Sequence, residues 1–162
     1  LQEFAPAMNN LGWMYEKGRG VKTDDRRAVN WYRKAAALGD GAAMNNLGRM
    51  YQEGAGVPRD DEEAVYWYRR AARLGDVGAM NNLGWMYSEG LGVRRNDRKA
   101  FRWYLHAAKL GHSAAMNNLG WMYQEGLGAE LNEERAIRWY RRAARMGDAA
   151  AMNNLGWMYQ EG

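Results

Sequence analysis

The side chains with the clearest chemical character in this sequence form a recurring set, in which an Asn-Asn pair is followed three residues later by Trp. The pair occurs five times, and Arg49 replaces the Trp in the second copy. A carboxamide both donates and accepts hydrogen bonds, as a peptide backbone does. An indole ring offers a large apolar face. This set predicts recognition by contact rather than catalysis.

We predict that these groups bind an extended peptide. The asparagines would bond its backbone, the tryptophans would pack its side chains, and Arg49 would meet an acidic group. The predicted site comprises Asn9, Asn10, Trp13, Asn45, Asn46, Arg49, Asn81, Asn82, Trp85, Asn117, Asn118 and Trp121. The next turn adds polar residues beside this row. They are Glu16, Gln52, Ser88, Gln124 and Gln160.

A structural role is the alternative for each of these residues. Either Asn could bond the adjacent repeat, and this role is favoured for the second of each pair, which lies nearer the packed edge. Arg49 argues that the Trp position is exposed, because buried positions rarely accept Arg. A row of exposed tryptophans indicates contact with a partner.

Groups suited to catalysis or metal binding are scarce. The absence of cysteine excludes disulfides, thiolate zinc sites and cysteine nucleophiles. His106 takes a position held elsewhere by Lys or Arg and is expected to be exposed, whereas His112 takes a turn position held elsewhere by Asp. Glu16 and Glu53 have no second carboxylate at a fixed spacing. We therefore predict no catalytic residue, no metal, no cofactor and no enzymatic activity.

A repeat of 36 residues positions the recognition set. The string Ala-Met-Asn-Asn-Leu-Gly begins at Ala7 and recurs without insertion, which defines repeats 7–42, 43–78, 79–114 and 115–150 and a half repeat 151–162. A period in this range predicts a stacked array in which each unit contacts its neighbours. The length of 162 residues favours a single solenoid domain, 1–162.

Each repeat reads as two amphipathic helices. At 100° per residue, the apolar side of the first helix centres on Leu11, with Asn9, Asn10 and Trp13 on the other side. The second helix centres on Tyr32. Small residues on both helices predict a close approach of the two backbones. The predicted N-caps of the second helices are Asp24, Asp60, Asn96 and Asn132.

Composition narrows the class of protein. Hydrophobic residues make up 47% and charged residues 26%, as in folded globular proteins. A continuous apolar run long enough for a membrane span is absent, so we expect no membrane partner. The net charge of +4 is only mildly basic. The chain opens on Leu1 without a signal peptide, which suggests an excised piece, and its compartment stays open.

The recurring residues resemble the Sel-one-like repeat family, a branch of the tetratricopeptide-like repeats. The first repeat matches the family pattern at Ala7, Leu11, Gly12, Tyr15, Gly18, Gly20, Val21, Asp24, Ala28, Trp31, Tyr32, Ala35, Ala36 and Gly39. The resemblance implies an all-α, right-handed α/α superhelical solenoid of antiparallel helix pairs, with the first helices on its concave face. It also implies a non-catalytic scaffold for protein interactions. The disulfide-bearing subtype is not supported.

Several other functions compete with peptide binding. The same tryptophans could stack on sugar rings, which makes a carbohydrate binder the second hypothesis. A nucleic-acid binder would use the Arg and Lys stripe of the second helices, but interspersed acids favour a solvated face there. The near-identity of the first helices also fits an engineered scaffold without a natural ligand. Finally, the uncapped C-terminal helix predicts end-to-end self-association through Met152, Leu155 and Tyr159.

Overall fold

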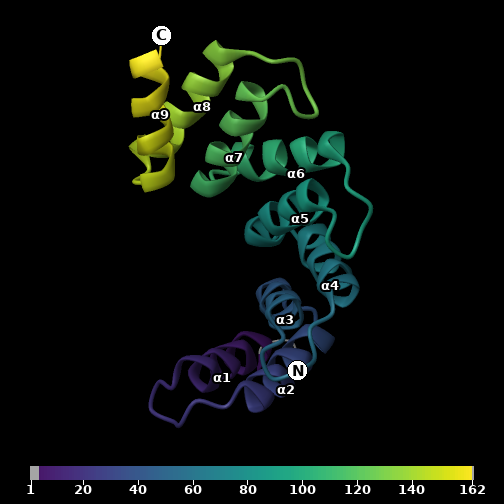
Figure 1. Cartoon of the computed structure of the whole chain (residues 1–162). Coiled ribbons are helices and arrows are strands. Elements are labelled where there is room, and N and C mark those ends of the chain that lie inside the picture. Colours follow the sequence, from purple (N-terminus) through teal and green to yellow (C-terminus); the bar gives the residue numbers. More distant parts are fainter. Residues whose placement is uncertain (1–3, 162) are drawn as a thin grey trace. The chain divides into compact units, whose positions relative to one another are not determined.

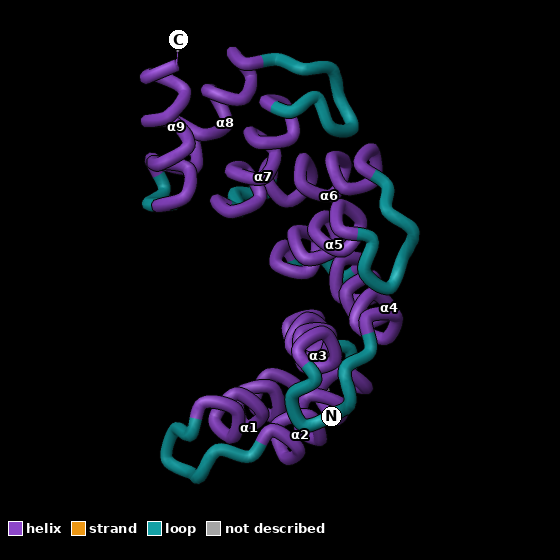
Figure 2. Tube along the Cα trace, viewed as in Figure 1, coloured by secondary structure: helices purple, strands orange, loops and turns teal. Residues whose placement is uncertain are grey.

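The computed structural model describes residues 4–161, which form nine helices and no strand (Figures 1 and 2). In chain order they are α1 (Ala5–Lys17), α2 (Asp25–Ala37), α3 (Gly41–Glu53), α4 (Asp61–Arg73), α5 (Val77–Glu89), α6 (Asp97–Lys109), α7 (Ser113–Gln124), α8 (Glu133–Arg145) and α9 (Ala149–Glu161). Odd-numbered helices are the first helices of the repeats and even-numbered helices are the second helices. The predicted all-α repeat fold is therefore confirmed.

The helices form two compact units. Unit 1 holds the residues up to Ala79 together with Leu91–Val93, and unit 2 holds Met80–Gly90 together with the residues from Arg94 onward. Within unit 1, α1 packs on α2, α2 on α3 and α3 on α4. Within unit 2, α6 packs on α7, α7 on α8 and α8 on α9. Among residues 4–161, every helix is too short and too polar to cross a lipid bilayer.

Side-chain caps begin the helices of both kinds. The predicted caps of the second helices are confirmed, as when Asp24 accepts from the Arg27 amide at 3.0 Å and Asn132 from the Arg135 amide at 2.9 Å. The first helices carry caps that the sequence patterns did not predict. Asp40 Oδ1 accepts from the Ala43 amide at 2.7 Å. His112 takes the same place before α7, where its Nδ1 accepts from an amide at 3.2 Å.

A glycine on the first helix of each full repeat lets a tyrosine of the second helix lie against its backbone. A Cβ atom on Gly48 would stand 2.7 Å from the ring of Tyr68, and one on Gly120 would stand 2.7 Å from the ring of Tyr140. Both tyrosines are buried. Since real Cβ contacts are longer, only glycine permits this packing, and the predicted close approach of the helices is confirmed.

The leucine at the centre of the apolar side of the first helix is buried to different extents in different repeats. Leu47 and Leu119 are fully buried, as predicted for this position. Leu11 is 37% exposed, which corrects its predicted place in the core. Leu47 and Leu119 lie on helices that pack on the second helix of the preceding repeat, α3 on α2 and α7 on α6.

Candidate functional site

The paired asparagines link the first helices of consecutive repeats within each unit. In unit 1, Asn46 Nδ2 donates to Asn9 Oδ1 at 3.0 Å. In unit 2 the same bond joins α7 to α5 and α9 to α7. Its pairs are Asn118 with Asn81 at 3.2 Å and Asn154 with Asn117 at 2.9 Å. We call each of these bonds an Asn rung.

The Asn rungs correspond to the structural alternative weighed for these residues, because both members of the pair take part in holding neighbouring repeats together. One hydrogen bond does not exhaust a carboxamide, which has two N–H donors and an oxygen with two lone pairs. A rung therefore fixes the position of both amides and leaves hydrogen-bonding capacity. Ligand binding by the asparagines stays a prediction. Asn10 is exposed, and Asn45 and Asn82 are half-buried.

The tryptophans that follow the Asn pairs are exposed, as the sequence predicted. Trp13 is 44%, Trp85 37% and Trp121 40% exposed, and Trp157 in the half repeat is 51% exposed. Residues three and four apart share a helix face. Each Trp therefore lies beside the Asn pair on its own helix. We call the surface made by Asn81, Asn118, Asn117, Trp85 and Trp121 in unit 2 the Asn–Trp face.

Arg49 occupies the Trp position in unit 1 and is held by carboxylates of the protein itself. One guanidinium nitrogen lies 2.6 Å from Glu16 Oε2 and the other lies 3.1 Å from Glu53 Oε2. The Tyr32 hydroxyl donates to the same Glu16 oxygen at 2.8 Å. These contacts make Arg49 part of an ion-pair network between repeats. Its predicted role toward an acidic group of a ligand has no support from this geometry.

Glu16 is the centre of this network, and its side chain is only 6% exposed. Burial raises the pKa of its carboxyl. Contacts from Lys17, Tyr32 and Arg49 act the other way, and together they hold the pKa below the ordinary value of 4.5. Lys17 Nζ lies 2.5 Å from Oε1 as an ion pair without hydrogen-bond alignment. The carboxylate is therefore charged in the folded protein at neutral pH.

The helical wheel was wrong about the residues one turn after the Trp. It placed Glu16 and its equivalents beside the recognition row, but in the structure Glu16, Gln52 and Gln124 turn toward the second helix of their own repeat. The Tyr68 hydroxyl donates to Gln52 Oε1 at 2.6 Å, and the Tyr140 hydroxyl donates to Gln124 Oε1 at 2.8 Å. A buried tyrosine hydroxyl needs a hydrogen-bond partner. The fixed spacing of 16 residues between that partner and the tyrosine was the sequence signal from which the pairing could have been predicted.

The tryptophans of the second helices are half-buried, and a cation on the next turn lies over the ring in three of the four full repeats. The cation lies 4.4 Å from the ring centroid for Lys34 over Trp31 and 5.6 Å for Arg142 over Trp139. The sequence predicted a solvated face for the cations. The spacing of Trp and cation at i and i+3, which recurs in three of the four full repeats, was the signal that this prediction missed.

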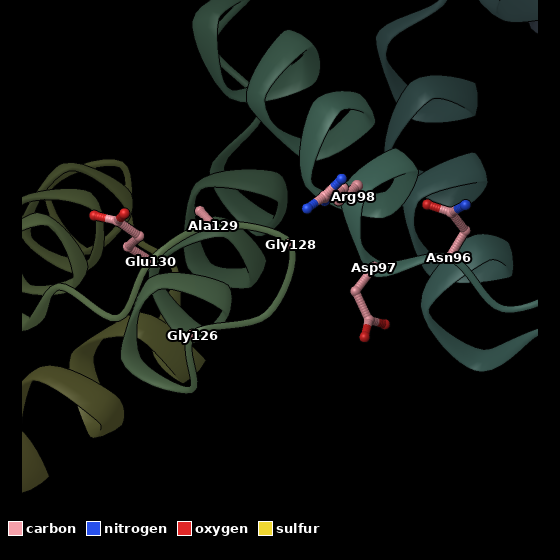
Figure 3. A pocket seen from close by; sticks show the side chains of 7 residues that line it. All are labelled: Asn96, Asp97, Arg98, Gly126, Gly128, Ala129 and Glu130. Atoms are coloured by element: carbon pink, nitrogen blue, oxygen red, sulfur yellow. The ribbon is translucent and has the colours of Figure 1, made fainter.

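A pocket in unit 2 lies where the loop after α7 meets the start of α6 (Figure 3). Its volume is about 590 Å³. Gly128 has φ +72°, and a Cβ atom there would stand 2.3 Å from the Asp97 carbonyl oxygen. Asn96 in this pocket is engaged in capping the Lys99 amide. The pocket is therefore a by-product of loop packing, and acids and Arg98 are mixed on its walls.

The described residues offer no metal centre. Within residues 4–161, His, Asp and Glu side chains do not gather in groups of three that could hold a metal ion. Burial raises the pKa of the Tyr104 hydroxyl to about 12, and the charge of Glu89 adds to the shift. This tyrosine is a packed core residue.

The model of the Sel1 repeat matches five segments of the chain, at residues 5–40, 41–76, 77–112, 113–148 and 149–162. Its frame begins two residues earlier than the one chosen from the sequence, with the same period. No curated protein matches the chain.

Solved structures of Sel1 repeat proteins are similar to the chain over nearly its whole length. A Sel1 repeat protein from Oxalobacter formigenes is 40% identical with a TM-score of 0.91, over 96% of this chain and 63% of that protein. A protective antigen of uropathogenic Escherichia coli with an SLR fold is 43% identical with a TM-score of 0.90, over 98% of this chain and 34% of the antigen. The chain thus spans less than two thirds of either relative.

The cysteine rich protein B of Helicobacter pylori is more distant. It is 26% identical with a TM-score of 0.65, over 85% of this chain and 99% of that protein. The present sequence contains no cysteine.

Proposed function

Because this chain belongs to the Sel1 repeat family, whose members generally act as non-catalytic scaffolds for protein interactions, we propose that it binds an extended peptide segment of a partner protein. The site proposed is the Asn–Trp face of unit 2. The tryptophans would pack apolar side chains of the peptide, and amide groups of the Asn rungs would bond its backbone.

The exposure of Trp121 is the observation that carries this proposal. Its indole is 40% exposed although the helix that bears it is otherwise packed on both neighbours. Arg49 shows that the fold accepts a different side chain at this position, so packing does not require Trp. A large apolar side chain that the fold does not require, and that recurs beside fixed amides, is typical of a contact surface.

Substitution of the exposed tryptophans tests the proposal. Peptides selected on the native protein from a random peptide library would be measured against Trp85→Ala and Trp121→Ala. Loss of a central aromatic contact costs about 2 kcal/mol, so each variant should weaken binding by roughly 10-fold or more. Tyr66→Ala is the control, because Tyr66 is a 49% exposed aromatic on α4 of unit 1. Equal affinity of all variants, with helicity unchanged, would reject the proposal.

A glycan array decides between peptide and carbohydrate, which is the alternative for the same indole rings. If glycans bind through Trp121 and library peptides do not, the ligand class proposed here is wrong. Failure of both libraries to yield a binder that depends on the tryptophans would favour a scaffold without a ligand at this face.

We also propose that the apolar surface of α9 self-associates. Met152 is 49% and Tyr159 55% exposed, whereas Leu155 is half-buried. Sedimentation at increasing concentration should show association that Met152→Lys weakens. A strictly monomeric protein at millimolar concentration would contradict this.

A further inference from the structure

We propose that unit 2 has a second binding site, a pocket between α5 and α6 that takes an acidic peptide segment. The pocket encloses about 390 Å³ and is lined by Tyr87, Lys99, Arg102, Trp103 and His106. It lies on residues that the proposed peptide site does not use, so either proposal can fail while the other holds.

The chemistry of this pocket is an apolar floor with a cationic rim. The four residues from α6 are spaced i, i+3, i+4 and i+7, which places them on one face of the helix. Tyr87 and Trp103 supply apolar surface, and basic side chains surround it. None of the lining residues is acidic. Within the described part of the chain, neither Lys99 nor Arg102 forms an ion pair with a carboxylate.

The contacts and burial of the aromatic rings in this pocket favour a carboxylate as the ligand over a nucleic-acid base. Lys99 Nζ lies 5.2 Å from the centroid of the Tyr87 ring, and the His106 ring stacks on Trp103 at 6.5 Å. Tyr87 is only 7% exposed. Stacking of bases needs open aromatic faces, whereas here Tyr87 is nearly buried and His106 lies against one face of Trp103. A Glu or Asp side chain can instead place its carboxylate between the cations while an apolar neighbour contacts the floor.

Equivalent positions in unit 1 do not carry this set of charges. In unit 1, Glu63 and Tyr66 take the places of Lys99 and Arg102 beside Trp67, and Asn30 takes the place of Arg102 beside Trp31. In α8 of unit 2 the cations recur, but Arg138 is paired with Glu134 at 3.2 Å. Among the second helices that the structure describes, α6 is therefore the one in which both cations lack a carboxylate partner.

The two histidines of the sequence make a direct test possible by NMR. His106 lies in the pocket, and His112 lies in the turn before α7 as an internal reference. Titration with a synthetic peptide of alternating glutamate and leucine should shift the His106 imidazole signals saturably and leave those of His112 in place. The matched peptide of glutamine and leucine should shift neither.

Charge reversal then separates a defined pocket from general attraction. Arg102→Glu should weaken binding of the acidic peptide about 10-fold or more. Arg94→Glu changes the net charge equally at an exposed position outside the pocket and should weaken binding less than about 3-fold. Circular dichroism checks that both variants keep their helicity. Equal losses in the two variants, or an unmoved His106, would overturn the proposal. Tighter binding of oligothymidylate than of the peptide, with His106 shifting, would also overturn it in favour of nucleic acid.

Discussion

The junction between α1 and α3 in unit 1 and the junction between α5 and α7 in unit 2 share one backbone plan and one Asn rung, but they use the next helical position differently. In unit 1 that position is Arg49, which is bound to Glu16 of the preceding repeat. In unit 2 it is Trp121, which is 40% exposed. The fold therefore leaves this position open, and its residue can either join repeats or face a partner.

The partner residue in the preceding repeat differs in the same way. Glu16 in unit 1 carries a charge that Arg49 and Tyr32 satisfy. At the junction between α7 and α9, where Trp157 fills the position, the neutral side chain of Gln124 accepts the hydrogen bond of the tyrosine hydroxyl. The charged pair and the exposed indole are thus two solutions at one site, and only the indole leaves apolar surface for a ligand.

The largest expected effect tests what the two junctions share. Gly48→Ala and Gly120→Ala should each lower the free energy of unfolding by about 1–3 kcal/mol, because the new methyl group overlaps a buried tyrosine ring. Gly156→Ala on α9 is the matched control, since its Cβ would meet no atom within 4 Å. Ala there should stabilise by up to about 1 kcal/mol through helix propensity. Urea unfolding measures all three, and stabilisation by Gly120→Ala would contradict the packing described.

The second prediction concerns the position at which the junctions differ. Arg49→Ala should destabilise the protein by about 1–2 kcal/mol, because it takes one of two cations from the nearly buried carboxylate of Glu16 and leaves the more exposed Lys17. Trp121→Ala should cost less than about 0.5 kcal/mol at its exposed position. Thermal unfolding checks both.

The double variant with Glu16→Gln and Arg49→Trp would reproduce in unit 1 the residues found at the junction between α7 and α9, which are Gln124 and Trp157. The double variant should regain most of the stability lost by Arg49→Ala. Equal stability losses for Arg49→Ala and Trp121→Ala would mean that the two junctions are not different in kind.

Unfolding at low pH tests the junction between α1 and α3, which contains the carboxylate of Glu16. The folded-state pKa of Glu16 is lowered, so the carboxylate contributes stability above its unfolded pKa of about 4.5, and this stability is lost as the pH falls through the folded value. The native protein should therefore lose more stability than Glu16→Gln when the pH is lowered from neutral to about 3. Parallel curves from urea unfolding at each pH would show that Glu16 is not coupled to folding.

The smallest expected effect concerns helix caps. Asp40 caps α3 in unit 1, whereas His112 caps α7 in unit 2 through Nδ1 at 3.2 Å. His112→Asp should stabilise the protein by about 0.5 kcal/mol, because Asp is a preferred cap and its charge favours a helix N-terminus. Asp40→His is the reverse control in unit 1. No gain in melting temperature from His112→Asp would indicate that the imidazole caps α7 equally well.

Much of this architecture was predictable because it depends on local rules repeated in phase. The period of 36 residues gave the number of helices, and Asp24 and Asn132 marked helix starts through a cap geometry that depends on neighbours in sequence. Arg49, as a single exception at a Trp position, predicted the exposure of that position correctly. These inferences need only the chain itself and its regularity.

Contacts between helices were decided by the tertiary structure. A helical wheel gives the angle of Glu16 about its own helix axis, but the length and position of Tyr32 on another helix determine that the carboxylate turns inward. The same holds for the Asn rungs, where the rise from one repeat to the next brings two amides within 3.0 Å. The amino-acid sequence determined which groups lie on each helix, whereas side-chain reach across the interface between helices decided which of them bond to the protein itself.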